Sequence, residues 1–260
     1  MNIHQSIKTT IMKKVLFTII GIAMTVLNCA NAQENVKEFD IKGFERIEIK
    51  GSSEVVYNQG NEFNITVKAS TPSLLEKAIV EKNGNTLILS NKNYESKNIG
   101  FFDMLKGIKN EISASNIVFY VTSPDLIGVT LTGSGDFECK TYLDTDNLDI
   151  TLKGSGDIDF KDIICDKLNI YLTGSGDVEI DNVKTITSKV DLKGSGDVKF
   201  HQTDVKYTDL SLYGSGDIVV DCKNCGEVSA SIKGSGDITI KGETTKVNQN
   251  VRGSGDINIR

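Results

Sequence analysis

From Ile127 onward, apolar and polar residues alternate along the chain with a period of two. Successive side chains of a β-strand point to opposite faces, so this period predicts strands with one buried face and one solvated face. The same arrangement recurs around Leu192 and Ile232. One complete apolar row is Leu168, Ile170, Leu172, Gly174, Gly176, Val178 and Ile180. The pattern predicts that the C-terminal half consists of half-buried strands in a repeated arrangement.

The tetrapeptide Gly-Ser-Gly-Asp recurs seven times within this alternation, at intervals of 19 to 21 residues. A unit of about 20 residues is too short for a strand–helix–strand crossover, but it suits one coil of a parallel β-solenoid. We therefore predict an all-β fold, a right-handed parallel β-helix with about 20 residues per coil. A flat sandwich of hairpins is the alternative, although hairpins would not repeat one corner in one register.

Each tetrapeptide is predicted to form a tight corner between two strands of a coil. Glycine tolerates the backbone angles of such a bend, and we expect that no side chain fits inside it. The predicted corner glycines are Gly133, Gly135, Gly154, Gly156, Gly174, Gly176, Gly194, Gly196, Gly214, Gly216, Gly234, Gly236, Gly253 and Gly255.

Stacked coils would align the aspartates of the motif in one column. These are Asp136, Asp157, Asp177, Asp197, Asp217, Asp237 and Asp256. Carboxylates about 4.8 Å apart repel by roughly 1 kcal/mol in water, and we expect glycine N–H groups or serine hydroxyls of the corner to offset this repulsion. Compensating charge is expected from Lys153, Lys193, Lys233 and Arg252. The alternative is that the column binds Ca²⁺, which prefers oxygen ligands; no other cofactor is predicted.

Residues 33–125 are predicted to form a less regular part of the same solenoid, and residues 126–260 the regular repeats. The segment 44–57 resembles a degenerate copy of the repeat. Gly51 stands in the place of the first glycine of the motif, and Glu54 in that of the aspartate. The array therefore has an eighth, weaker member at its start.

Two further elements are predicted between this copy and the regular repeats. Thr71 followed by Pro72 predicts the N-cap and first turn of a short helix that ends near Asn83, and a capping box at residues 73–76 is the alternative start. Residues 91–115 are predicted to form an excursion, for which a second short helix is one option. We expect these elements to cover an open end of the array.

Residues 1–32 are predicted to be a signal peptide. Two lysines precede an apolar run at residues 15–27, and residues 30–32 (Ala-Asn-Ala) have the form of a signal-peptidase site. Met12 is an alternative start of translation, and Cys29 would carry the lipid if the chain were a lipoprotein. The apolar run is short for a membrane span, so we predict no transmembrane span in the mature chain. We expect export to the periplasm, the outer-membrane surface or the cell exterior.

The charge of the chain bears on its partners. The formal net charge is −6, and removal of residues 1–32, which hold three lysines and no acids, takes it to −9. Binding of DNA or RNA requires a basic surface, so a nucleic-acid partner is not expected.

Cys222-Lys-Asn-Cys225 is a CxxC motif. In an exported protein this spacing predicts a local disulfide, with unpaired thiols as the alternative. A zinc site would need a second pair of ligands, and redox catalysis would need a strand-to-helix context that the repeat does not offer. We therefore predict a structural role for Cys222 and Cys225.

Residues suited to catalysis are few. After removal of the signal peptide the chain has one histidine, His201, at an outward strand position, and the Gly-Ser-Gly serines recur without a histidine partner in each repeat. These features argue against a serine nucleophile activated by histidine. We therefore predict no catalytic residues, and a polysaccharide-cleaving β-helix enzyme is the alternative.

Taken together, the motifs resemble those of the head GIN domain family of putative auto-transporter adhesins. The resemblance covers residues 39–260 and rests on the exported N-terminus, the Phe-x-x-Ile-x-Ile-Lys-Gly51 strand, the helix with Leu74, the strand at 85–89 and the Gly-Ser-Gly-Asp-Ile units. It implies a right-handed parallel β-helix at the cell surface or in the periplasm of Gram-negative bacteria. It carries over no active site.

On these grounds we expect a non-catalytic, adhesin-like binding scaffold whose partner is a glycan or a protein. The alternatives are a carbohydrate-active enzyme and a cation-stabilised structural spacer. The sequence stops inside the last repeat, so the final coil is expected to expose a strand edge. End-to-end association of two chains is a further expectation.

Overall fold

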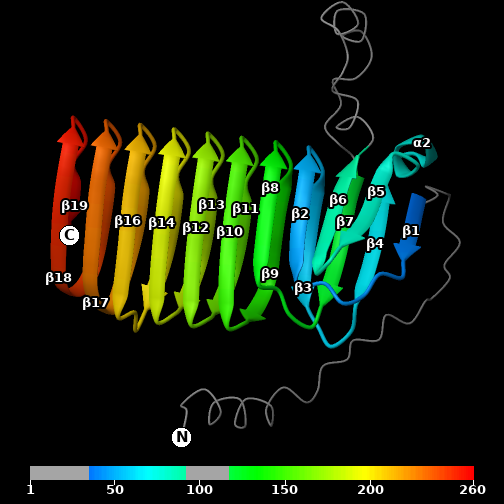
Figure 1. Cartoon of the computed structure of the whole chain (residues 1–260), viewed down its shortest axis with the longest axis horizontal. Coiled ribbons are helices and arrows are strands. Elements are labelled where there is room, and N and C mark those ends of the chain that lie inside the picture. Colours follow the sequence, from blue (N-terminus) through cyan, green and yellow to red (C-terminus); the bar gives the residue numbers. More distant parts are fainter. Residues whose placement is uncertain (1–34, 92–116) are drawn as a thin grey trace, which may run out of the picture. The chain divides into compact units, whose positions relative to one another are not determined.

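Each repeat folds into one coil of a β-solenoid, with two strands joined at the Gly-Ser-Gly-Asp corner (Figure 1). The structure is a computed structural model, and it describes residues 35–91 and 117–260. Strands of successive coils pair in parallel, so that equivalent residues lie one above another, as do Leu152, Leu172, Leu192 and Leu212. The predicted all-β solenoid with coils of about 20 residues is therefore confirmed.

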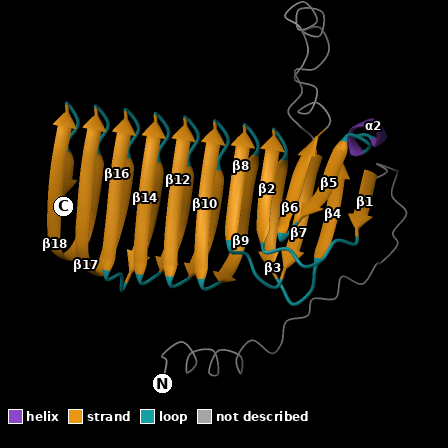
Figure 2. Cartoon of the chain, in the orientation of Figure 1, coloured by secondary structure: helices purple, strands orange, loops and turns teal. Residues whose placement is uncertain are grey.

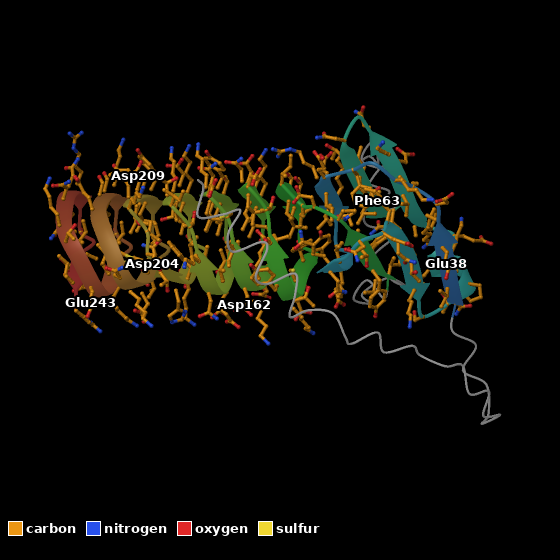
Figure 3. The ribbon with its side chains drawn as sticks, turned by 90° about the horizontal axis from the view of Figure 1, so that it is seen from below. Glu38, Phe63, Asp162, Asp204, Asp209 and Glu243 are labelled. Atoms are coloured by element: carbon orange, nitrogen blue, oxygen red, sulfur yellow. The ribbon has the colours of Figure 1, made fainter. Side chains whose placement is uncertain are left out.

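The strands form one continuous sheet that is folded into two facing walls. The first wall contains β8 (Gly128–Gly133), β10 (Asn147–Gly154), β12 (Lys167–Gly174), β14 (Thr187–Gly194) and β16 (Tyr207–Gly214). The second wall contains β9 (Asp136–Asp144), β11 (Ile158–Ile164), β13 (Val178–Lys184) and β15 (Val198–Thr203). The last strands of the regular repeats are β17 (Ile218–Gly234) and β18 (Ile238–Gly253), which run through both walls, and β19 (Ile257–Ile259) in the second. Side chains project outward from both walls, Asp209 from the first and Asp162 from the second (Figure 3).

The inward rows of the two walls form one continuous core. Aliphatic side chains such as Leu152 and Ile180 are fully buried. Among the aromatic residues, Phe137 packs between Tyr57 and Phe160, with ring centroids 6.2 Å and 5.3 Å apart. Burial of each large apolar side chain contributes about 1.5–3 kcal/mol, so stability is distributed along the whole stack of coils.

The degenerate repeat has the predicted register. Its region contains β2 (Arg46–Gly51), β3 (Glu54–Gln59), β6 (Thr86–Asn91) and β7 (Ile117–Ser123). Pairing of β2 with β8 sets Gly51 beside Gly133, and pairing of β3 with β9 sets Glu54 beside Asp136. However, β6 and β7 pair in parallel with the other edges of β2 and β3. The coil of β2 and β3, the first in the sequence, therefore lies between the strands β6 and β7 on one side and β8 and β9 on the other.

Antiparallel strands cover the N-terminal end of the stack, as expected of a capped solenoid. The covering elements are β1 (Asn35–Phe39), β4 (Asn64–Ala69), β5 (Ala78–Asn83) and the helix α2 (Pro72–Leu75). β5 pairs with β6, β4 pairs with β7, and β1 pairs with β4. Figure 2 shows α2 at this end, beside strands that fill the rest of the fold.

The helix is shorter than the sequence predicted. Thr71 is its N-cap and Pro72 stands in its first turn, both as predicted, but it ends at Leu75. The rest of the predicted helix is the strand β5. Ile79 and Val80 are β-branched and favour a strand, and β6 offers them a partner edge, so tertiary pairing overrides the local helix signal.

The last coil presents the other end of the stack. Within the described residues, β19 pairs with β18 alone. Val251 and Ile259 are 43% and 50% exposed. End-to-end association through this edge stays a prediction. The predicted signal peptide, with Met12 and Cys29, lies outside the described residues, and so does the excursion predicted at residues 91–115, except for Asn91, which ends β6.

Candidate binding faces

The structure places both glycines of each motif at the corner between the walls. At Gly154, φ is +142° and an added Cβ would lie 1.9 Å from the carbonyl oxygen of Gly133. A Cβ on Gly156 would lie 1.8 Å from the oxygen of Gly135, and the same contacts recur at the later corners. The prediction that a side chain would not fit inside the bend is therefore wrong as the reason for glycine. The obstacle is the backbone of the preceding coil, one strand spacing away, and not the inside of the bend.

The seven aspartates of the motif form the predicted column, but their partners differ from those predicted. In each of the first six, Oδ1 accepts a hydrogen bond from the backbone N–H of the next aspartate in the column, at 2.8 to 3.2 Å. The serine and glycine N–H groups of the corner donate elsewhere, for example from Ser155 to the carbonyl oxygen of Gly133 at 2.9 Å. Each carboxylate thus ties its coil to the next, which offsets the repulsion within the column.

The expected compensation by basic residues is wrong. Lys153, Lys193, Lys233 and Arg252 belong to the first wall, on the other side of the corner from the aspartates. Within residues 35–91 and 117–260, none of these four forms an ion pair with the column. Backbone amides, and not lysines, stabilise the carboxylates.

A pair of substitutions at Asp177 tests this account of the column. Asp177→Ala removes the acceptor for the N–H of Asp197, 2.8 Å away, and is expected to lower the free energy of unfolding by about 1 kcal/mol. Asp177→Asn keeps an oxygen acceptor and removes like-charge repulsion, so it should be at least as stable as the wild type. Urea denaturation of both variants measures the difference. Equal stability of the two would contradict the hydrogen-bonded ladder.

The cation hypothesis for the column stays a prediction. Among the described side chains, no group of three or more His, Cys, Asp and Glu residues is arranged to hold a metal ion. If the column binds Ca²⁺, millimolar calcium should raise the melting temperature and EDTA should reverse the rise. The same melting curve with and without calcium would remove the hypothesis, and Mg²⁺ at equal concentration controls for ionic strength.

A second acidic group lies beside the column on the second wall. Asp159 stands directly opposite Glu138 and Glu179 in the strand register, and the three line an open depression of about 280 Å³. Burial, followed by the negative charges of Asp157 and Glu179, raises the pKa of Asp159 to about 6. Sequence reasoning missed this group. The available signal was the second residue after each motif aspartate, which is acidic in three successive repeats.

Asp159→Asn is expected to stabilise the protein at neutral pH. The folded state raises the pKa of Asp159 from 3.8 to about 6, so ionisation in the folded state carries a penalty that is absent below about pH 4 and complete above about pH 6. Because the side chain also reaches water, the expected gain at pH 7.5 is only about 1 kcal/mol, and it should vanish at pH 4. Thermal melts at the two pH values measure it.

Asp181→Asn is the matched control for this prediction. It removes the same charge from the same depression, but Asp181 acts favourably on Lys199. We therefore expect no gain in stability from Asp181→Asn. An equal gain from both variants would mean that general charge reduction, and not crowding around Asp159, limits stability.

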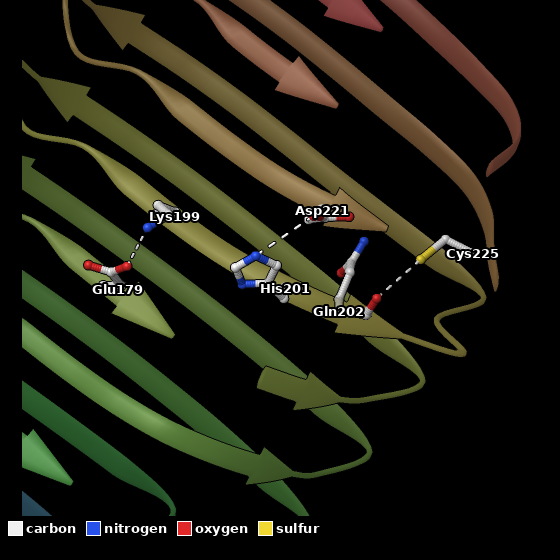
Figure 4. A network of polar contacts seen from close by, with 6 residues as sticks. All are labelled: Glu179, Lys199, His201, Gln202, Asp221 and Cys225. Atoms are coloured by element: carbon white, nitrogen blue, oxygen red, sulfur yellow. Dashed lines mark hydrogen bonds and ion pairs between the residues drawn. The ribbon is translucent and has the colours of Figure 1, made fainter. Parts of the chain in front are cut away.

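Cys222 and Cys225 are buried at the second corner of their coil, beside each other and beside Gln202. Gln202 Nε2 donates to Cys222 Sγ at 3.3 Å, and Cys225 Sγ lies 3.9 Å from the carbonyl oxygen of Gln202 (Figure 4). The hydrogen bond with Cys225 and burial raise the pKa of the Cys222 thiol. Both are free thiols in this structure, and their disulfide stays a prediction.

His201 lies on the outside of the second wall, as expected of a surface residue. Its Nε2 is 3.7 Å from Asp221 Oδ2, and half of each side chain is exposed. The neighbouring Lys199 pairs with Glu179 on the same wall (Figure 4). Both contacts are exposed to solvent and have weak effects on stability, and the contact that His201 makes here is with an acid and not with a serine.

Comparisons with known proteins agree with this architecture. A family model described as "Putative auto-transporter adhesin, head GIN domain" matches residues 43–242 and 189–260. No curated protein matches the sequence. Within the described part of the chain, no helix is long and apolar enough to cross a membrane.

Several solved structures share the fold. A putative adhesin from Bacteroides fragilis is 24% identical, with a TM-score of 0.73 over 88% of this chain and 98% of that one. A putative lipid binding protein from Parabacteroides distasonis is 22% identical, with a TM-score of 0.66 over 88% and 98% of the two chains. A putative adhesin from Parabacteroides merdae is 18% identical, with a TM-score of 0.65 over 88% and 97%. Identities this low establish the shared fold alone.

The two segments that match the family model include the degenerate repeat, all of the capped end except β1, and all seven Gly-Ser-Gly-Asp corners. They cover well over half of the chain. The chain therefore belongs to the family of the putative auto-transporter adhesin head GIN domain.

Proposed function

We propose that this protein is an exported, non-catalytic binding scaffold that contacts a glycan or protein ligand with its outer walls. The observation that carries the proposal is the repetition of the outward rows. The strands of successive coils pair in the same register, so equivalent outward side chains form straight rows across each wall, with one residue per coil. Such a surface suits an extended partner that makes many weak contacts along it, and other solenoid proteins use extended binding surfaces of this kind. The adhesin description of the family agrees with this role.

The acidic group around Asp159 supports a second candidate, a carbohydrate-active enzyme. Its raised pKa is a property of carboxylic acids that donate protons in glycoside hydrolysis. However, Glu138, Asp159 and Glu179 stand side by side on adjacent strands of one flat wall. Glycosidases flank the scissile bond with two carboxylates, and this arrangement does not enclose a bond between them. The binding scaffold is therefore the better supported function.

Binding of the labelled protein to arrays of glycans and of cell-surface proteins tests the proposal. We expect saturable binding to at least one class of ligand, with no release of new reducing ends from the bound glycan. Reducing-end release that Asp159→Asn abolishes would support the enzyme instead. Absence of binding to every arrayed glycan and protein would contradict the scaffold, and calcium-dependent stability without any ligand would favour a structural spacer. Cell fractionation tests the proposed export.

A further inference from the structure

On the first wall, the residue before the first corner glycine is basic in every second coil from Lys50 to Lys233, and again in the last coil at Arg252. Strand register places these residues in one straight row across the wall. The row consists of Lys50, Thr132, Lys153, Thr173, Lys193, Tyr213, Lys233 and Arg252, and we name it the cation row. With strands about 4.8 Å apart, basic residues on every second strand recur at roughly 9.6 Å. The row is exposed from Lys153 onward.

Lys50 of the cation row is paired with Glu48 at 3.2 Å, but the charges from Lys153 onward are available to a ligand. Within the described residues, Lys153, Lys233 and Arg252 have no acidic partner, whereas Lys199 on the second wall pairs with Glu179. Stacked cations at regular spacing repel one another, and a bound anion would relieve that repulsion. The unpaired cations of the row therefore favour binding of an anion.

The positive charge is confined to a single line. Lys189, two rows from the cation row on the same wall, is paired at 3.0 Å with Asp191 of the adjacent row, and Arg46 and Asp149, both two rows away, are paired at 2.9 Å. A membrane surface would meet these acids as well as the cation row. A linear polymer that lies along the row faces its unpaired cations, and Asp191 in the adjacent row is already paired with Lys189, so charge complementarity favours a linear anion over an anionic bilayer.

Exposed tyrosines accompany the cations. Tyr213 belongs to the row and is 45% exposed, and its ring centroid lies 6.0 Å from Lys193 Nζ. Tyr171 is 38% exposed in the adjacent row. Aromatic rings at a wet surface offer an apolar face to the C–H face of a sugar and a hydroxyl for hydrogen bonding. This combination of rings and cations indicates an acidic sugar rather than a simple anion.

We propose that the cation row binds a linear anionic polysaccharide that carries one charge on every second sugar. This inference rests on the proposed scaffold function and names its ligand class. The polymer lies across the coils, its acidic groups face Lys153, Lys193 and Lys233 in turn, and the uncharged sugars between them face Thr173 and Tyr213. The acidic second wall repels the same polymer, so that only one wall is used.

Binding to hyaluronan, which has one carboxylate per disaccharide, tests the inference at low ionic strength. We expect the wild-type chain to bind and added salt to weaken binding. The triple variant Lys153→Gln, Lys193→Gln, Lys233→Gln should bind about tenfold more weakly or worse, because three exposed contacts are lost. The matched control is Lys161→Gln, Lys199→Gln, Lys241→Gln, which removes the same charge from the second wall and should bind like the wild type. Circular dichroism checks that both triples fold.

The alternative outcomes are distinct. Equal loss of binding in both triples would overturn the cation row as the site. Binding to phosphatidylglycerol vesicles through the row, without binding to hyaluronan, would overturn the polysaccharide in favour of a lipid surface. Binding to neutral dextran or another glycan that the first-wall triple leaves unchanged would overturn the inference and leave the scaffold function standing. Absence of binding to all of these and to the arrays would contradict both.

Discussion

Gly176→Ala is expected to lower the free energy of unfolding by about 3 kcal/mol or more, although it adds only one methyl group. Its Cβ would lie 1.9 Å from the carbonyl oxygen of Gly156, so the added atom meets backbone that cannot rotate away. The change also displaces the N–H of Gly176 from the carbonyl oxygen of Gly154, 3.2 Å away. Urea denaturation followed by circular dichroism measures the loss.

Ser175→Ala is the matched control for Gly176→Ala. Ser175 is the exposed residue between the two glycines of the same corner, so its truncation should change stability by less than about 0.5 kcal/mol. A destabilised glycine variant beside a neutral serine variant identifies stacking of the coils as the constraint. A Gly176→Ala protein as stable as the wild type would contradict the close approach of successive corners.

Phe137→Ala is expected to cost about 4 kcal/mol, because it removes a fully buried ring and leaves a cavity. The ring joins Tyr57 of the degenerate coil to Phe160 of the following coil. Its loss should therefore weaken the attachment of the capped end to the regular array. Hydrogen exchange should show faster opening of β2 and β3 than of β14 and β16.

Tyr142→Ala, in the same strand β9, is the control for Phe137→Ala. Tyr142 is 42% exposed, and its truncation should cost less than about 1 kcal/mol. Uniform loss of protection along all coils in Phe137→Ala would mean that the array unfolds as one cooperative unit and not coil by coil.

The repeated part of the fold could be predicted because one local pattern is used seven times. The period of two gave the strands, and the glycines before and after Ser155 marked the corner. The capped end could not be predicted in the same way. Ile79 and Val80 form a strand because β6 presents an edge to them, and β2 lies between β6 and β8 because of pairings between distant segments. Such pairings are properties of the assembled stack.

The candidate faces were only partly visible in the sequence for a related reason. The position of Lys153 and its equivalents next to the motif suggests the aspartates as their partners. The structure separates them by placing the corner between the two walls. Asp159 and its neighbours each look unremarkable in their own repeat, and only the register brings their charges together.

The aspartate column also determines how such a protein changes in size. From Asp157 to Asp237, the N–H of each aspartate donates to the carboxylate of the coil before it, and its own carboxylate accepts from the coil after it, so these coils are interchangeable. An extra 20-residue unit inserted between two coils would find a carboxylate acceptor in the coil before it and an N–H donor in the coil after it. Duplication of one repeat would then lengthen both walls by one strand and leave the capped end untouched. The distance over which the protein reaches its partner is thus adjustable in steps of a single strand.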